Sequence, residues 1–151
     1  MVVTTASEAQ TQALGRRLGR LLKGWDLVCL YGGLGSGKTT LTRGLAQGAG
    51  SRNRVASPTF SLARIYRAGR RLIYHIDLYR VGPDGTREIG LEEFVSDPRG
   101  ICVVEWPEAG EAYYPADRLD VRLAHVRGGR RLAFRAHGPR SRDIIRRLEA
   151  A

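Results

Sequence analysis

Lysine is almost absent from this chain of 151 residues. Of its 25 basic residues only Lys23 and Lys38 are lysines, and the other 23 are arginines. Neither lysine stands in an Asn-Lys-x-Asp context, so the sequence lacks the motif with which GTPases read guanine. The scarcity also makes the lysine at position 38 unlikely to be accidental.

Cysteine and long apolar runs are scarce as well. Cys29 and Cys102 each lie in a short apolar stretch, which indicates two buried, reduced thiols and no disulfide framework or metal site. No apolar run approaches the roughly 20 residues of a membrane helix. The first ten residues show no basic segment followed by an apolar one, so we expect no secretory signal and a cytoplasmic protein without a membrane partner.

Positive charge is abundant and uneven. The formal net charge is +10, and residues 117–151 hold ten arginines against four acids. Such a surface suits RNA or an acidic partner protein. A solvated basic face is an equally good explanation, and no RNA-binding motif with interleaved aromatic residues accompanies the charge.

The pattern of apolar residues indicates a single α/β domain over 1–151, with a mixed β-sheet flanked by helices. Alternating and continuous apolar runs predict a strand over 26–32, another over 100–108, and hairpins within 57–80 and 120–137, the second with one solvated face. Helical spacing predicts helices over 7–22, 38–48, 87–95 and 141–150.

The stretch "YGGLGSGKTTLTRGLA" contains the Walker A pattern of a P-loop. It follows an apolar strand and opens a helix, which is the context that a P-loop needs. Its backbone N–H groups would face the phosphates of a nucleotide. We expect positive φ angles at four glycines, namely Gly32, Gly33, Gly35 and Gly37. Lys38 would contact the β- and γ-phosphates, Thr39 would bind Mg²⁺, and Thr40 could contact the α-phosphate.

A P-loop also requires an acid at the end of a neighbouring buried strand. Glu105 directly follows "ICVV", and Asp77 ends "RLIYHID", so both are candidate Mg²⁺ ligands. A structural role, capped or ion-paired, is the alternative for each, with Arg80 close to Asp77. Thr59 in "SPTF" either reaches Mg²⁺ or the γ-phosphate from a loop or caps a strand.

Two ring side chains, His75 and Trp106, stand near these acids in the sequence. His75, in "YHIDLYR", is more often a packing residue than a functional one in such a strand. A tryptophan such as Trp106 is more often a core residue than a gate, but it directly follows Glu105, a position that would suit a role in sensing the nucleotide.

Several motifs together resemble one family. "GGLGSGKTTLTRGL", "SPTFSL", "YHIDLYR", "EIGLEEF" and "VVEWPE" occur in the order found in bacterial TsaE (YjeE) proteins. The resemblance runs from about Ser7 to Arg130. It implies an ATPase for the synthesis of threonylcarbamoyladenosine (t6A) in tRNA, with ATP and Mg²⁺ as cofactors and the TsaD–TsaB pair as partner. In that family ATP hydrolysis supports repeated turnover by TsaD–TsaB.

The resemblance also implies roles for individual residues. Lys38, Thr59, Asp77 and Glu105 would serve hydrolysis, and Thr39, Asp77 and Glu105 would bind the metal. The remaining expected nucleotide contacts are Ser7, Thr11, Gly32, Gly33, Gly35, Ser36, Gly37, Thr40, Trp106 and Arg130. Members of the family usually carry an acid where this chain has Gly33, a departure that spares the residues expected to hold phosphate.

Two other functions stay open at this point. A small-molecule P-loop kinase would need a lid and an acceptor pocket, and the arginines of "RIYRAGRR" could form a lid. A nucleotide-gated RNA-binding module would bind tRNA without TsaD–TsaB, with an affinity that depends on salt.

Overall fold

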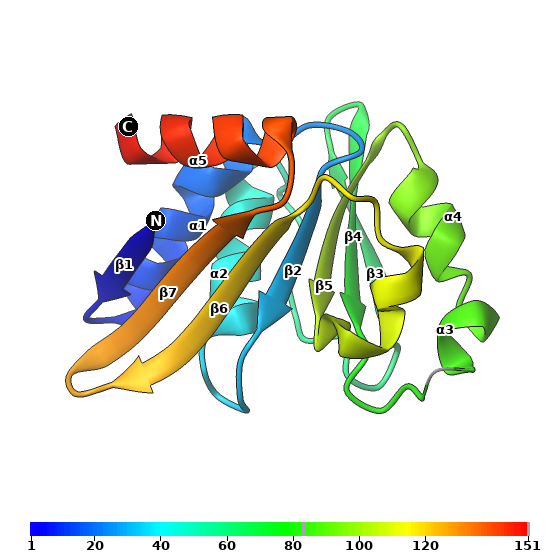
Figure 1. Ribbon diagram of the computed structural model, residues 1–151, viewed down its shortest axis with the longest axis horizontal. Helices are drawn as coiled ribbons and strands as arrows, with labels where there is room; N and C mark the ends of the chain where they lie inside the picture. Colours follow the sequence, from blue (N-terminus) through cyan, green and yellow to red (C-terminus); the bar gives the residue numbers. More distant parts are fainter. Residues whose placement is uncertain (83, 151) are drawn as a thin grey trace.

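A seven-stranded sheet with the strand order β1-β7-β6-β2-β5-β4-β3 forms the centre of the molecule (Figure 1). The computed structural model describes residues 1–82 and 84–150. The strands are β1 (Val2–Thr5), β2 (Leu27–Tyr31), β3 (Ala63–Ala68), β4 (Arg71–Asp77), β5 (Gly100–Glu105), β6 (Leu119–Val126) and β7 (Gly129–Ala136). The helices are α1 (Glu8–Leu21), α2 (Lys38–Gly48), α3 (Gly85–Glu88), α4 (Leu91–Ser96) and α5 (Pro139–Ala150), with a 3₁₀ segment η1 (Pro107–Tyr113).

The middle of the sheet is parallel and its two edges are antiparallel. β2 pairs in parallel with β5 and β6, and β4 pairs in parallel with β5. β3, β7 and β1 extend the sheet as antiparallel strands. The predicted mixed α/β sheet and both hairpins are therefore confirmed. Because β2, β4 and β5 run the same way, Tyr31, Asp77 and Glu105 end at one edge of the sheet, where ligands of such folds bind.

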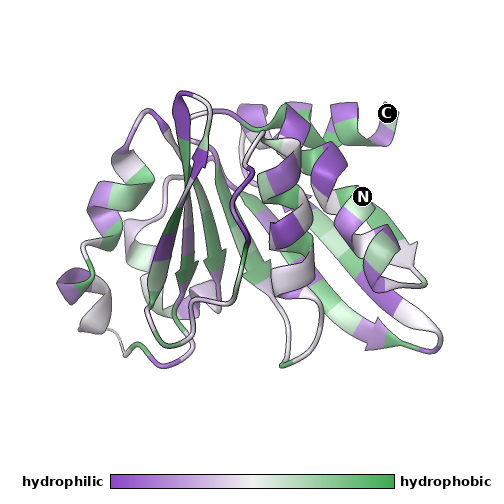
Figure 2. Cartoon of the chain, turned by 180° about the vertical axis from the view of Figure 1, so that it is seen from behind, coloured by the Kyte–Doolittle hydropathy of each residue, from purple (hydrophilic) through white to green (hydrophobic). Residues whose placement is uncertain are grey.

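Two apolar clusters cover the two faces of the sheet. Val28 and Leu30 of β2 pack on one face with α1, α2 and α5, whereas Cys29 and Tyr31 pack on the other with α4 and η1. All five residues of β2 are buried, as its continuous apolar run predicts. Seen from behind, the central strands are mainly hydrophobic and the helices carry hydrophilic patches (Figure 2).

The helices α1 and α2 approach each other unusually closely because glycines form their contact. Gly15 and Gly19 of α1 face α2, and Gly44 and Gly48 of α2 face α1. A Cβ atom built on any of the four would lie 2.0–2.3 Å from a backbone carbonyl oxygen of the opposite helix. Only glycine fits there, so the backbones themselves set the separation of the two helices.

Three local features differ from the sequence-based expectation. The helix expected over 87–95 is two short helices, because Gly90 takes a left-handed conformation with a φ of 68° between them. Strand β1 and the segment η1 were not predicted. The two cysteines are buried and free, as expected. Among the described residues no helix is both long and apolar enough to cross a membrane.

Candidate functional site

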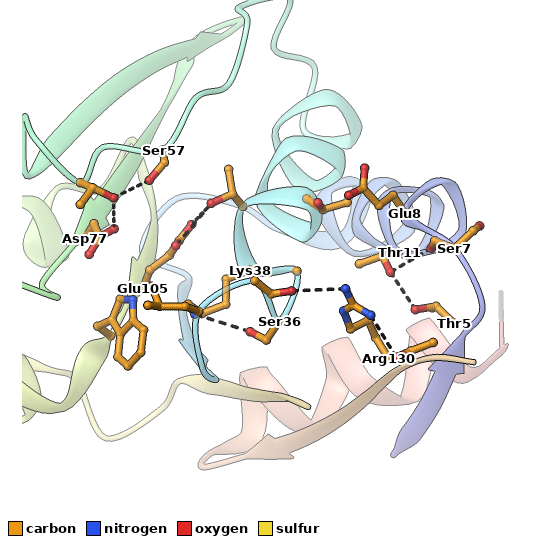
Figure 3. Close-up of a pocket in the computed structure, with 18 of the residues that line it drawn as sticks. Thr5, Ser7, Glu8, Thr11, Ser36, Lys38, Ser57, Asp77, Glu105 and Arg130 are labelled. Atoms are coloured by element: carbon orange, nitrogen blue, oxygen red, sulfur yellow. Dashed lines mark hydrogen bonds between the residues drawn. The ribbon is translucent and has the colours of Figure 1, made fainter. Parts of the chain in front are cut away.

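A cavity of about 500 Å³ opens at the carboxyl edge of the parallel strands (Figure 3). The first turn of α2 lies at its centre, the start of α1 at one end, and the loop before β3 at the other. Its lining residues are Thr5, Ala6, Ser7, Glu8, Thr11, Leu34, Gly35, Ser36, Gly37, Lys38, Thr39, Thr40, Ser57, Thr59, Asp77, Glu105, Trp106, Gly129 and Arg130.

The P-loop turns from β2 into α2 through glycines with positive φ angles. The φ values are 154° at Gly32, 70° at Gly35 and 104° at Gly37. A side chain at Gly32 would also clash, since its Cβ would lie 2.6 Å from the carbonyl oxygen of Leu123 on β6. The expectation for Gly33 was wrong, because its φ is not positive and its Cβ position is open. The loop therefore requires glycine where its backbone takes a positive φ angle, and at Gly32 also where it contacts β6.

Lys38 is held inside the P-loop. Its Nζ donates hydrogen bonds of 2.7 Å and 2.8 Å to the carbonyl oxygens of Gly32 and Gly33, and it lies 4.4 Å from the ring centre of Trp106. The residue is only 5% exposed. Burial lowers the pKa of the ammonium, while the nearby carboxylates of Glu105 and Asp77 oppose that shift. Nζ also donates to the Ser36 hydroxyl at 3.5 Å, so its hydrogen-bond partners are neutral oxygens and the buried cation is poised to accept an anion.

Glu105 ends β5 and is connected to the P-loop by Thr39. The Thr39 hydroxyl donates to the Glu105 carboxylate over 3.1 Å. On its other side the same carboxylate oxygen lies 2.8 Å from Nε2 of His75, a side chain with no exposed surface. Because a carboxylate only accepts, Nε2 carries the proton in this pair. The His75 Nδ1 atom lies 3.4 Å from the hydroxyl of Tyr66.

Asp77 ends β4 in register with Glu105. Its carboxylate accepts hydrogen bonds from the Thr59 hydroxyl at 3.0 Å and from the backbone N–H of Tyr79 at 2.9 Å. The Ser57 hydroxyl lies 2.7 Å from that of Thr59. Arg80 is the alternative partner that the sequence offered for Asp77. Its guanidinium instead stacks over the exposed ring of Phe60, which lies in the same loop as Thr59.

The opposite end of the cavity is formed by the start of α1 and by β7. Ser7 caps α1, and its side-chain oxygen accepts from the N–H of Gln10. The Thr11 hydroxyl is already bonded to Thr5 at 2.7 Å. Arg130 donates to the carbonyl oxygen of Gly35 at 3.3 Å and so joins β7 to the P-loop. Figure 3 shows Ser7 and Thr11 far from Asp77, with Lys38 between them.

The residues around Thr39 fit a hard divalent cation. A hydroxyl oxygen and two carboxylates, Glu105 and Asp77, face one cavity, and Mg²⁺ prefers such oxygen ligands. Among residues 1–82 and 84–150 no group of three or more His, Cys, Asp or Glu could hold a metal by itself. The Mg²⁺ of nucleotide enzymes usually takes one or two protein ligands and completes its shell with phosphates and water.

The structure brings nearly all predicted site residues to this cavity. Gly32 and Gly33 do not line it and contribute only their carbonyl oxygens, which hold Lys38. Sequence reasoning missed Ser57, although it stands in the same "SPTF" motif as Thr59. It also gave His75 a packing role, because nothing in the sequence shows that Nε2 reaches Glu105 from the adjacent strand.

Comparison with known proteins gives a consistent result. The family model for "Threonylcarbamoyl adenosine biosynthesis protein TsaE" matches residues 5–132. The tRNA threonylcarbamoyladenosine biosynthesis protein TsaE of Streptomyces coelicolor is 45% identical over 120 residues, which are 76% of this chain and 79% of the relative. The TsaE protein of Bacillus subtilis is 35% identical over 145 residues, 95% of this chain and 90% of the relative.

A solved structure extends the similarity to the fold. The crystal structure of Bacillus subtilis YdiB superimposes with a TM-score of 0.82 at 30% sequence identity, and the match covers 99% of this chain and 94% of that one. The match therefore extends over the whole sheet and the helices that flank it. The matches in sequence and in structure together show that this chain belongs to the TsaE family.

Proposed function

We propose that the protein is a P-loop ATPase of tRNA t6A modification, which binds and hydrolyses ATP–Mg²⁺ together with a TsaD–TsaB pair. The observation that carries the proposal is the convergence of Lys38, Thr39, Glu105 and Asp77 on one cavity at the carboxyl edge of the sheet. The names of its relatives support the pathway, since they are called tRNA threonylcarbamoyladenosine biosynthesis proteins.

Each residue has a defined task in this proposal. The Lys38 ammonium leaves the carbonyl oxygens of Gly32 and Gly33 and pairs with the β- and γ-phosphates. Thr39 and Glu105 would hold Mg²⁺, which would supply positive charge to the phosphates. Asp77, fixed by its two hydrogen bonds, orients a water or the Thr59 loop toward the γ-phosphate.

The far end of the cavity receives the nucleoside. Ser7 and the first turn of α1 lie there, beside Arg130. ATP that spans both ends contacts α1, α2 and the ends of β4 and β5 at once. This span explains why a chain of 151 residues devotes elements from both halves of the sequence to one cavity.

The γ-phosphate end is open and built partly from an exposed loop. Ser57 is exposed, and Phe60 in the same loop has 88% of its surface exposed. We therefore propose that the TsaD–TsaB pair docks at this end and completes the hydrolytic site. The isolated protein should then turn over ATP slowly.

The decisive experiment measures hydrolysis of γ-labelled ATP with and without the cognate TsaD–TsaB pair. Stimulation by the pair, with all label released as free phosphate, supports the proposal. Label on a small metabolite would instead support the kinase alternative. An absence of both stimulation and binding to the pair would contradict the proposed partnership.

A further inference from the structure

One part of the sheet has a face that no helix of the described chain covers. In Figure 1, β6 and β7 lie in front of α1 and α2, and their near side is open. Residues that pair on adjacent strands point to the same side of a sheet. Tyr31 packs on the open side and pairs with Arg122, and Arg122 in turn pairs with Ala133, so both of these residues point to the open side. By strand alternation, Arg131 and Arg135 point to the same side.

We call this surface the arginine face and define it by Arg122, Arg131 and Arg135. All three residues are exposed. In the β6–β7 register Arg131 pairs with Ala124, and Arg135 pairs with Asp120. Arg122 is therefore a diagonal neighbour of both Arg131 and Arg135, at about 7–8 Å. The three arginines form a triangle across two strands, with the small residue Ala133 between Arg131 and Arg135 on β7.

Negative charge on this side of β6 and β7 is already neutralised. Asp120 is 5% exposed, and its carboxylate accepts from Arg118 Nε at 3.2 Å and lies 2.7 Å from His137 Nε2. The Asp120 carboxylate is therefore not available as an ion-pair partner for the arginine face. Glu111 of η1 helps to raise the pKa of the Tyr31 hydroxyl, and η1 packs on the same side of the sheet as Tyr31. The arginine face thus carries net positive charge, and a ring contact holds Arg122 over Tyr31 at 4.4 Å without neutralising it.

The composition of the face favours a phosphate backbone over a folded acidic protein. Stable protein interfaces depend on buried aromatic or large aliphatic anchors. Here the side chains between the arginines are small, and the exposed apolar residues are two valines, Val2 and Val126. Arginines at regular spacing with little apolar area are typical of contacts to phosphates.

We propose that the arginine face binds the phosphate backbone of tRNA. The choice of tRNA among RNAs rests on the proposed function, whereas the binding of a phosphate backbone rests on the face itself. Arg130 and Arg131 are consecutive residues of β7 and point to opposite sides of the sheet, the first into the nucleotide cavity and the second onto the arginine face. One strand would then contact ATP on one side and tRNA on the other.

The test measures binding of fluorescently labelled tRNA by anisotropy between about 50 and 200 mM salt. The test variant is R122Q/R131Q/R135Q, and the matched control is R142Q/R146Q/R147Q, which removes three exposed arginines from α5. The test variant should raise Kd at least about 10-fold and lower the slope of log Kd against log salt by about 3, one for each phosphate contact. The control should change both values much less.

Three outcomes would overturn the proposal. Unchanged tRNA binding by the test variant would do so, as would an equal loss in the α5 control, which would show an effect of net charge alone. A variant that keeps tRNA binding but loses affinity for the TsaD–TsaB pair would assign the face to an acidic protein surface. The ATPase activity of each variant is measured in parallel. A variant that loses ATPase activity but keeps tRNA binding, or one that loses tRNA binding but keeps ATPase activity, shows that this proposal and the proposed function can fail separately.

Discussion

Replacing His75 with leucine should slow ATP hydrolysis without removing nucleotide binding. His75 has no exposed surface and donates from Nε2 to the Glu105 carboxylate over 2.8 Å. A hydrogen bond to a charged group contributes about 1.5–3 kcal/mol, and loss of a partner that orients a metal ligand typically costs about 10- to 100-fold in activity. We therefore expect His75→Leu to lower kcat by about 10- to 100-fold.

The change should leave the phosphate contacts intact. His75 forms hydrogen bonds with Glu105 and Tyr66, whereas Lys38 bonds to the P-loop carbonyls, so the affinity for ATP should fall by only a few-fold. The Mg²⁺ concentration for half-maximal activity should rise, because Glu105 would lose the partner that fixes its orientation. Both quantities follow from Mg²⁺ and ATP titrations of the stimulated ATPase.

A conservative variant separates positioning from packing. The side-chain amide of His75→Gln can place an N–H donor near the position of Nε2, so this variant should retain most of the activity that His75→Leu loses. Thermal unfolding of both variants serves as the control for folding. Wild-type kcat in His75→Leu, or equal losses in two folded variants, would refute the role assigned to this hydrogen bond.

Three further predictions concern the cavity, α5 and the thiols. Lys38→Ala should abolish ATP binding in calorimetry, and Glu105→Ala should keep some binding but stop phosphate release; full activity in Glu105→Ala would end its assignment to Mg²⁺. Asp117 accepts hydrogen bonds from the Ser141 hydroxyl and from two N–H groups of the first turn of α5, and although burial opposes them, these bonds bring its pKa below the ordinary 3.8. Its stabilisation is therefore present above about pH 4 and is lost as pH falls through the lowered pKa. Asp117→Asn should then reduce the free energy of unfolding by about 1 kcal/mol at pH 7 in urea titrations, and this difference should shrink as the pH is lowered below about 4. Burial raises the pKa of Cys29 and brings that of Cys102 to about 12, so iodoacetamide at pH 8 should modify neither thiol until urea unfolds the chain; rapid labelling of the folded protein would contradict this.

Strong local signals made much of the fold predictable from the sequence. The continuous apolar run of β2, the P-loop and the two hairpins are specified by residues close together in the chain. Strand β1 was missed because its four residues, "VVTT", show no clear alternation and become a strand by pairing with β7 more than 120 residues later. The helix over 87–95 was drawn as one because a glycine within a helical pattern does not by itself show a left-handed turn.

The site was predictable for the same reason and only to the same extent. Lys38, Thr39 and Glu105 belong to recognisable local motifs, and the structure places them within one cavity. The contact between His75 and Glu105 depends on the order of the strands, since β4 and β5 are adjacent in the sheet but separated by two helices in the chain. Sequence spacing carries no information about that contact.

The glycine contact between α1 and α2 has a consequence for ligand selection. Ser7 precedes α1, and Lys38 begins α2, so α1 carries one end of the cavity and α2 carries its centre. Because backbone meets backbone along their contact, no side-chain rotamer can adjust the distance between that end and the P-loop. The helix pair therefore fixes the distance between the two groups of ligand contacts. A single methyl group added at Gly19, which does not line the cavity, should increase this distance and weaken ligands that must touch both Ser7 and Lys38.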